Sequence, residues 1–411
     1  MHILFLTDNF PPEVNAPASR TFEHCREWVR LGEQVTVITC APNFPKGKVF
    51  AGYRNHLWQT ETMEGIQVIR VWTYITANEG FIRRSLDYVS FMIAATIASI
   101  RVKKVDVVIG TSPQFFTVCA AYVVGLLKRV PWIFELRDIW PQSIKAVGSM
   151  GDGPLYRTLE HLELFLYKKA NRIIALTQSF KKELITRDVD ADKIDVVTNG
   201  VDLDLFKPRS KDEALLKKLG LENQFIAGYI GTIGMAHGLE TIIDAAEIIK
   251  NTPNPENQSI KILILGDGAR KEPLKQLAKD KKLKNLIFID TVPKAEVAEY
   301  WSLLDISIIH LKKDPLFEKV IPSKLFESMA MGVPVLHGVL GESAEIVSRL
   351  GVGTTFTPDC PQVLAKELLN LSMNTLELQQ MKKAALQAAS QFDREHLAKS
   401  MLASITETVK T

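Results

Sequence analysis

Short apolar runs alternate with helical patterns along almost the whole chain of 411 residues. Strands that are apolar on both faces and separated by helices are typical of a parallel sheet that helices cover on both sides. In the first half, the expected strands are 3–6, 35–39, 68–71, 105–110, 132–136, 172–176 and 194–197, and the expected helices are 20–31, 86–102, 116–128, 155–170 and 179–186. In the second half, the expected strands are 225–230, 260–265, 286–289 and 306–310, and the expected helices are 239–250, 270–279, 295–304 and, last, about 393–410.

The alternation breaks at a polar stretch over 202–218 and then resumes. This break predicts an α/β protein of two doubly wound, Rossmann-like parallel-sheet domains, residues 1–203 and 204–392. Ligands of such sheets bind at the carboxyl ends of the strands, so two facing domains would enclose a cleft with one substrate on each side. Segment 252–257 is expected to be a surface loop.

Composition narrows the class of protein. The chain is 46% hydrophobic and 24% charged, as expected for a soluble globular protein, and its net charge of +3 gives no reason to expect a nucleic-acid partner. The four cysteines are scattered without metal-ligand spacing, which favours reduced thiols in a cytosolic protein and no metal site. The longest apolar stretch, 89–100, is shorter than the roughly 20 residues that span a bilayer, and the first residues predict a strand rather than a signal peptide.

Segment 322–336 is the most informative about function. It predicts a helix start that carries Ser323 and Lys324, with Glu327 one turn later and Gly332 at the helix end. A helix start offers free N–H groups and partial positive charge to a phosphate, and a carboxylate nearby can hold a diol such as a ribose. The alternative is an ordinary helix start, with Ser323 as a cap and Lys324 paired to Glu327, a pair worth only about 0.2–0.5 kcal/mol.

Two glycine loops follow successive strands of the second half. The first contains Gly231, Thr232 and Gly234, and the second contains Gly266, Asp267 and Gly268, followed by Arg270. Glycine lets backbone N–H groups approach a phosphate, although each loop alone could be an ordinary turn.

In the first half, the loop 7–20 leads into a helix with Ser19 as a candidate cap. Arg137 and Asp138 end a strand and are expected to face the cleft, or else to form an ion pair that only shapes the loop. Asp202 and Asp204 resemble an Asp-x-Asp metal motif, but a turn is the favoured interpretation.

In this order along the chain, the residues resemble a family 4 glycosyltransferase of the GT-B fold over essentially the whole length. The resemblance rests on segments 10–13, 170–177 with 182–184, 199–202 with Phe206 and Pro208, 266–268, and 322–324 with Glu327, 329–330, Gly332 and Pro334. Segments 137–141 and 322–324 are most similar to the bacterial O-antigen and capsule subgroup that transfers N-acetyl-L-fucosamine.

The resemblance implies a retaining, metal-independent transfer from a UDP-sugar donor, without a cofactor. The second domain would hold the donor, and the first, joined by the final helix 393–411, would hold the acceptor. The residues implied to bind the donor are Gly231, Thr232, Gly234, Gly266, Asp267, Gly268, Arg270, Ser323, Lys324 and Glu327. The residues implied on the acceptor side are Asn15, Ala16, Arg20, Arg137 and Asp138. Catalysis would depend on Lys324, Glu327 and Asp138.

This sequence departs from the family pattern at four positions. Thr232 and His237 stand where most relatives have Arg and Lys, Lys319 (beside Glu318) stands where most have Glu, and Arg137 stands where many have His. The leaving diphosphate still needs a counter-charge. Lys324, Lys319 and Arg270 are the candidates, and the helix-start position favours Lys324. No protein base is assigned.

Basic residues flank the apolar helix 86–102. Segment 81–84 precedes it, and Arg101, Lys103 and Lys104 end or follow it. Such flanks suit docking on a membrane surface, whereas the alternative is a helix buried against the sheet.

Together with these features, the resemblance implies a cytoplasmic enzyme, peripheral to the inner face of the cell membrane, that extends a polyprenyl-diphosphate-linked saccharide in O-antigen or capsule synthesis. The expected sugar is an N-acetylated deoxyhexosamine such as N-acetyl-L-fucosamine. Two alternatives stay open: a non-hydrolysing UDP-sugar 2-epimerase, and a catalytically silent sugar-nucleotide-binding protein.

Overall fold

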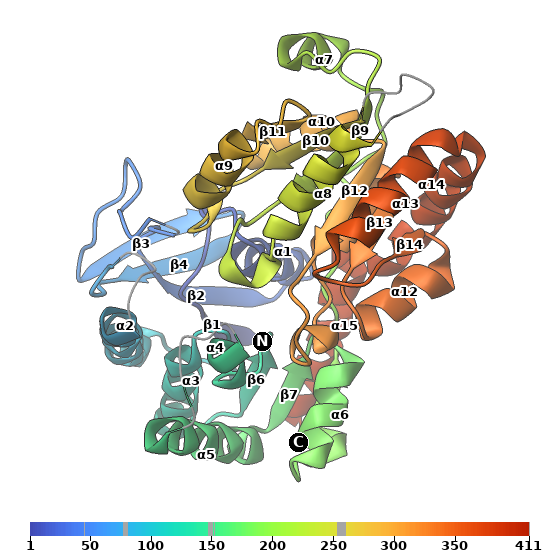
Figure 1. Ribbon diagram of the computed structural model, residues 1–411. Coiled ribbons are helices and arrows are strands. Elements are labelled where there is room, and N and C mark those ends of the chain that lie inside the picture. The colour runs from blue at the N-terminus through green and yellow to red at the C-terminus, as the bar shows by residue number, and fades with distance from the viewer. Residues whose placement is uncertain (45, 77–80, 147–150, 152, 253–259, 411) are drawn as a thin grey trace. The chain divides into compact units, whose positions relative to one another are not determined.

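The computed structural model describes residues 1–44, 46–76, 81–146, 151, 153–252 and 260–410. It separates into two compact units, Met1–Asn199 with Arg394–Thr411, and Gly200–Asp393 (Figure 1). Each unit contains one sheet with parallel strand pairing between its helices, so the predicted α/β class with two doubly wound domains is confirmed. The expected loop 252–257 falls almost wholly outside the described residues.

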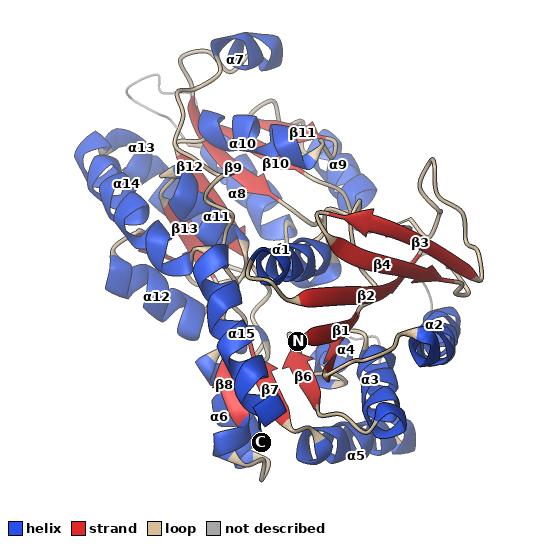
Figure 2. Ribbon diagram, turned by 180° about the vertical axis from the view of Figure 1, so that it is seen from behind, coloured by secondary structure: helices blue, strands red, loops and turns tan. Residues whose placement is uncertain are grey.

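The sheet of the first unit has the order β3-β4-β2-β1-β5-β6-β7-β8. Its strands are β1 (His2–Leu6), β2 (Gln34–Cys40), β3 (Trp58–Met63), β4 (Ile66–Val71), β5 (Val107–Thr111), β6 (Trp132–Leu136), β7 (Arg172–Ala175) and β8 (Ile194–Val196). Every pair in this order is parallel except β3 with β4, which is antiparallel (Figure 2).

Among the described residues of the first unit, β3 is the one strand that the sequence patterns did not predict. It lies at the sheet edge and alternates between half-buried and exposed residues, so it lacks the continuous apolar run of its neighbours. Glu64 and Gly65 connect it to β4, both with positive φ (49° and 81°). Two such residues form the tight hairpin turn that twisted strands favour.

The helices of the first unit are α1 (Ala16–Arg30), α2 (Phe81–Arg101), α3 (Phe115–Lys128), α4 (Gln142–Ala146), α5 (Pro154–Lys169), α6 (Gln178–Thr186) and α15 (Arg394–Lys410). Helix α1 starts earlier than expected because Asn15 caps it, its Oδ1 accepting a hydrogen bond from Ala18 N at 2.8 Å. The prediction of Ser19 as the cap is therefore wrong, since Ser19 lies inside the helix.

Helix α15, at the end of the chain, packs into the core of the first unit. Trp28 on α1 donates its indole N–H to the carbonyl of Ala398 at 2.9 Å. Met401 and Ile405 of α15 are fully buried in the same cluster as Phe5 of β1.

The second unit has a parallel six-stranded sheet in the order β11-β10-β9-β12-β13-β14. Its strands are β9 (Phe225–Ile230), β10 (Ile260–Leu265), β11 (Leu286–Ile289), β12 (Ile306–His310), β13 (Val335–Gly338) and β14 (Gly353–Thr355). Its helices are α7 (Glu213–Leu219), α8 (Glu240–Asn251), α9 (Lys271–Asp280), α10 (Lys294–Leu303), α11 (Lys324–Met331), α12 (Glu342–Leu350), α13 (Pro361–Met373) and α14 (Thr375–Ala389).

Strand β9 lies at the centre of this sheet, between β10 and β12. The segments after the three strands therefore start at one edge of the sheet, as parallel strands require. Helix α7 was not expected, because it begins within the polar stretch 202–218. Asp212 caps its start by accepting a hydrogen bond from Leu215 N, and Gly220 ends it.

Candidate active site

The two predicted glycine loops of the second unit pack directly against each other. A Cβ atom on Gly266 would lie 1.9 Å from the carbonyl oxygen of Gly231, and one on Gly268 would lie 2.3 Å from that of Ile233. The amide of Ile233 donates to Asp267 O at 2.9 Å, and the amide of Arg270 donates to Ile233 O at 3.0 Å. Only glycine fits at 266 and 268, where φ is also positive (149° and 154°).

Lys324 lies beside the first of these loops. It is 9% exposed, and its Nζ donates a hydrogen bond to the Tyr229 hydroxyl at 2.9 Å. A Cβ on Gly231 would come within 3.1 Å of the same Nζ. Burial lowers the pKa of Lys324 to about 8, although the nearby charge of Glu327 raises it. The structure therefore places a buried cation, held by a neutral partner, against a glycine loop.

The ordinary helix-start interpretation of Ser323 and Lys324 is not what the structure shows. Ser323 has helical dihedral angles, φ −58° and ψ −29°, and its side chain makes no capping hydrogen bond. The Lys324 ammonium is hydrogen-bonded to Tyr229, and the nearby charge of Glu327 raises its pKa. The amide of Leu325 already bonds to Pro322 O, and the amides of Phe326 and Glu327 bond to Ser323 O, so a phosphate at this helix start would meet the N–H of Lys324 rather than these three.

The other candidate counter-charges have different surroundings. Arg270 donates its Nε to Glu240 Oε1 at 3.1 Å, so its charge is already opposed. Lys319 is half-buried at the end of a short 3₁₀ turn, Phe317–Lys319. Burial, together with the charge of Lys324, lowers the pKa of His237 to about 3, so its ring is neutral near pH 7 and adds no cation.

In the first unit, the predicted acceptor residue Arg20 is used within the protein interior. It is 1% exposed, and its Nε pairs with Glu135 Oε1 at 2.9 Å. Its two terminal nitrogens donate to backbone carbonyls, to Thr198 O at 2.7 Å and to Val197 O at 3.0 Å. This geometry makes Arg20 a buried link between α1, β6 and the end of β8, and leaves it poorly placed to contact an acceptor.

Arg137 and Asp138 follow β6, as predicted, but they do not form the ion pair considered above. Arg137 directs a guanidinium nitrogen to Pro17 O at 3.2 Å, next to Asn15 and Ala16 at the start of α1. The structure therefore brings Arg137 to the predicted acceptor residues of α1. Burial raises the pKa of Asp138 to about 6, against a hydrogen bond from Ser143 that lowers it.

Two residues with distinctive surroundings were not predicted. Tyr229 joins Lys324 to the first glycine loop. Asp8, at the end of β1, accepts a hydrogen bond from the Gln114 amide, and burial together with the charges of Asp87 and Glu13 raises its pKa well above the usual range. Asp8 lies just after the end of a strand. Every residue of such a loop shares that position, so the position alone does not identify Asp8 as a site residue.

The Asp-x-Asp segment is a turn, as favoured above. Asp202 Oδ1 accepts hydrogen bonds from the amides of Asp204 and Leu205, at 2.9 and 3.2 Å. Across the described ranges, the structure shows no group of three or more His, Cys, Asp or Glu residues placed to hold a metal ion.

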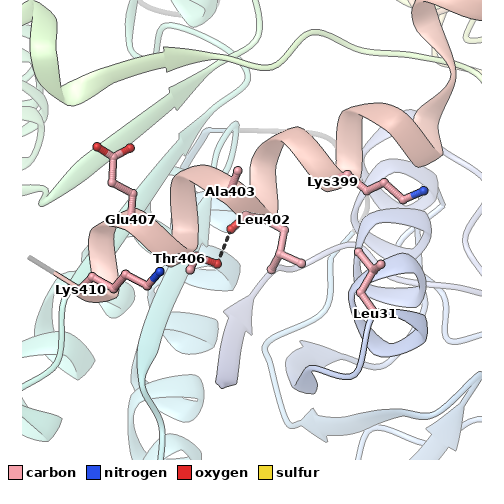
Figure 3. Close-up of a pocket in the computed structure, with 7 residues that line it drawn as sticks. All are labelled: Leu31, Lys399, Leu402, Ala403, Thr406, Glu407 and Lys410. Atoms are coloured by element: carbon pink, nitrogen blue, oxygen red, sulfur yellow. Dashed lines mark hydrogen bonds between the residues drawn. The ribbon is translucent and has the colours of Figure 1, made fainter.

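A hollow of about 480 Å³ lies in the first unit beside α15, and none of the predicted site residues lines it (Figure 3). It is lined by Leu31, Lys399, Leu402, Ala403, Thr406, Glu407 and Lys410. It is wide open to solvent and contains no residue that any of the sequence motifs singled out.

Comparisons with known proteins agree with this architecture. The family model "Glycosyl transferase 4-like domain" matches residues 15–200, and "Glycosyl transferases group 1" matches residues 211–388. The chain belongs to the family 4 glycosyltransferases of the GT-B fold, which confirms the resemblance at this level.

Relatives and solved structures cover most of the chain. The probable glycosyltransferase WbjE of Pseudomonas aeruginosa is 23% identical over 70% of this chain and 72% of its own. WcaI of Escherichia coli (strain K12), named as a colanic acid biosynthesis glycosyl transferase, is 24% identical over 81% and 82%. The structure of Anabaena Alr3699/HepE in complex with UDP covers 99% of this chain and 100% of that one, at 17% identity and a TM-score of 0.71.

Proposed function

We propose that this protein transfers a sugar from a UDP-sugar donor to a lipid-linked saccharide, with retention of configuration, during synthesis of a bacterial surface polysaccharide such as O-antigen or capsule. The observation that carries the proposal is the position of the buried Lys324 ammonium against Gly231, where the two glycine loops meet. A diphosphate is the substrate group that suits a cation, glycine loops and a helix start together.

The donor assignment has independent support from a similar fold. Anabaena Alr3699/HepE has been solved with UDP and with UDP-glucose. The sugar we propose is an N-acetylated deoxyhexosamine such as N-acetyl-L-fucosamine, on the resemblance of segments 137–141 and 322–324 alone. WcaI, through its name, supports a role in polysaccharide synthesis.

In the proposed reaction, the bond between the sugar and the β-phosphate breaks and the diphosphate gains negative charge. Lys324 opposes that charge from a fixed position, and preorganised electrostatic stabilisation of this kind is usually the largest single contribution to catalysis. Glu327, half-buried one turn further along α11, holds the ribose hydroxyls. The acceptor hydroxyl oxygen forms the new bond to the sugar, and its proton passes to the leaving diphosphate. The proposed acceptor contacts in the first unit are Arg137 and Asp138, near the start of α1. No metal is required in this scheme.

We also propose that the first unit docks on an anionic membrane surface through α2 and α3, which pack against each other. One face of α2 is buried through Phe91 and Ala95, as the alternative interpretation expected. Its other face exposes three isoleucines, and α3 exposes three aliphatic residues: Ile93, Ile97, Ile100, Val123, Leu126 and Leu127.

The charges around this face favour an anionic lipid surface as its partner. Exposed cations lie where α2 and α3 end: Arg101, Lys103, Lys104 and Arg129. A basic rim around protruding aliphatic side chains is typical of interfacial binding. None of the helices in the described part of the chain has the length and hydropathy needed to cross a bilayer. The side chains of Phe81 and Ile82, which precede this face, lie outside the described residues.

One incubation series separates the candidate functions. The protein is mixed with a panel of UDP-sugars, with and without a polyprenyl-diphosphate-linked saccharide, and products are separated by mass. Elongated lipid-linked product that forms only with acceptor supports the transferase. A 2-epimeric sugar released without acceptor would identify the epimerase instead. UDP binding without turnover across the panel would identify a silent binding protein.

A further inference from the structure

Tyr229 occupies a buried position between Lys324 and the first glycine loop. It is the second-last residue of β9 and its side chain is fully buried. Its hydroxyl lies 2.6 Å from Thr232 O and 2.9 Å from Lys324 Nζ. A carbonyl oxygen can only accept, so the hydroxyl hydrogen must point to Thr232, and the hydroxyl oxygen is left to accept from the ammonium.

The ring of Tyr229 also contacts the ammonium. Lys324 Nζ lies 4.1 Å from the ring centroid, within the range of a cation–π interaction. A lysine side chain is otherwise a flexible stem with a point charge at its end. A hydrogen bond and an aromatic face from one rigid residue therefore confine the ammonium to a single place.

The second contact of the hydroxyl fixes the loop itself. Thr232 lies between Gly231 and Ile233, whose carbonyl oxygens contact the other glycine loop closely. Tyr229 therefore ties the backbone of the loop and the cation of α11 to the same oxygen atom. An ammonium has three donors, and its hydrogen bonds to the described residues use one of them. Two donors remain to meet an anionic ligand at the loop.

We propose that Tyr229 is a positioning residue that holds the Lys324 ammonium and the Thr232 carbonyl in the arrangement that receives the diphosphate of the donor. This inference rests on the proposed function, and it adds a residue that neither the sequence motifs nor the helix start indicated. Tyr229 itself acts through Lys324 and the loop.

The test compares Tyr229→Phe with Tyr300→Phe, a matched tyrosine variant on α10 in the same unit. Tyr229→Phe keeps the ring and removes both hydrogen bonds. We expect its kcat to fall about tenfold, the scale of one hydrogen bond to a charged group, with little change in the KM for donor. Tyr300→Phe is expected to match the wild type in both constants.

The pH dependence separates positioning from a merely structural role. Without the hydroxyl, Lys324 loses an acceptor that favours its charged form, so the alkaline limb of kcat/KM is expected to move to lower pH in Tyr229→Phe. Wild-type kcat and an unmoved alkaline limb in this variant would overturn the inference, whatever its melting temperature.

Calorimetric titration with UDP distinguishes this inference from the proposed function. If wild-type protein binds UDP and transfers sugar while Tyr229→Phe behaves identically, only the role of Tyr229 fails. If wild-type protein neither binds UDP nor turns over UDP-sugars, the proposed function fails and the inference fails with it. A Tyr229→Leu variant that is more impaired than Tyr229→Phe would support the contribution of the ring.

Discussion

Gly266 lies against Gly231 so closely that a Cβ atom on it would be 1.9 Å from the Gly231 carbonyl oxygen. That oxygen is backbone and cannot rotate away, so a side chain at 266 must displace one loop or the other. The contact fixes the first glycine loop, which Lys324 and Tyr229 contact from other elements. The shape of the proposed diphosphate site therefore depends on the absence of a side chain at position 266.

Gly266→Ala is expected to abolish measurable UDP binding and to lower the unfolding temperature. Gly351→Ala is the control, because Gly351 also has a positive φ (64°) but no atom within 4 Å of an added Cβ. That control should cost about 1–2 kcal/mol from backbone strain alone and keep UDP binding. Calorimetry and thermal unfolding measure both quantities. Equal effects of the two substitutions would show that the close contact at 266 is unimportant.

Lys324→Ala is expected to lower kcat by roughly 10²-fold, the scale of losing one transition-state charge contact. Because the pKa of Lys324 is about 8, wild-type kcat/KM should decline as pH rises through 8, where the ammonium loses its proton. In Lys324→Arg, whatever activity remains should lack this decline, since arginine stays charged. Steady-state kinetics from pH 6.5 to 9.5 provide the measurement.

Two matched variants complete that experiment. Lys319→Ala and Arg270→Ala remove the other candidate cations, and each should retain more activity than Lys324→Ala. Near-normal turnover of Lys324→Ala together with a large loss in one of these two would transfer the counter-charge role to that residue.

The fold was predictable because both sheets are covered on two sides, so most strands are continuous apolar runs such as those of β1 and β9. Strand β3 was not predicted because one of its faces meets solvent and its sequence is mostly polar. Helix α7 was not predicted because none of its residues is buried, so it lacks a buried apolar face. Its caps, Asp212 and Gly220, mark only its ends.

The site was predictable only in part. Gly231, Gly266 and Lys324 carry local signals, and the structure brings them together. Tyr229 appears in the sequence as an ordinary strand residue. Its proposed positioning role depends on contact with Lys324, which is far away along the chain but adjacent in space. Arg20, which the resemblance placed on the acceptor side, is bound inside the first unit by Glu135 and two backbone carbonyls, contacts that no local sequence pattern indicates.

Acid should destabilise the protein partly through His237. Burial and the charge of Lys324 lower its folded-state pKa to about 3, against the usual 6.5. Between these values the unfolded chain binds the extra proton, so stability is lost as pH falls below 6.5. His237→Asn should reduce the slope of the unfolding free energy with pH by about 1.4 kcal/mol per unit between pH 5 and 6. Urea unfolding measures this slope. The control is His56→Asn, at an exposed site, which should keep the wild-type slope. An unchanged slope in His237→Asn would contradict a neutral, buried imidazole.

Membrane docking through α2 and α3 predicts that lipid binding depends on both apolar and basic residues of that face. Ile97 is 62% exposed, so Ile97→Glu should remove apolar contact with little effect on folding. Reversing Lys103 and Lys104 to Glu should weaken binding by at least tenfold, at about 1 kcal/mol for each cation near an anionic surface. Flotation with vesicles containing anionic lipid measures both, and neutral vesicles should retain little protein. Leu376→Glu on α14 is the matched control, since Leu376 is 67% exposed but lies in the second unit. Flotation that is absent in the wild type, or unchanged both by Ile97→Glu and by the reversal of Lys103 and Lys104, would exclude this face as the docking surface.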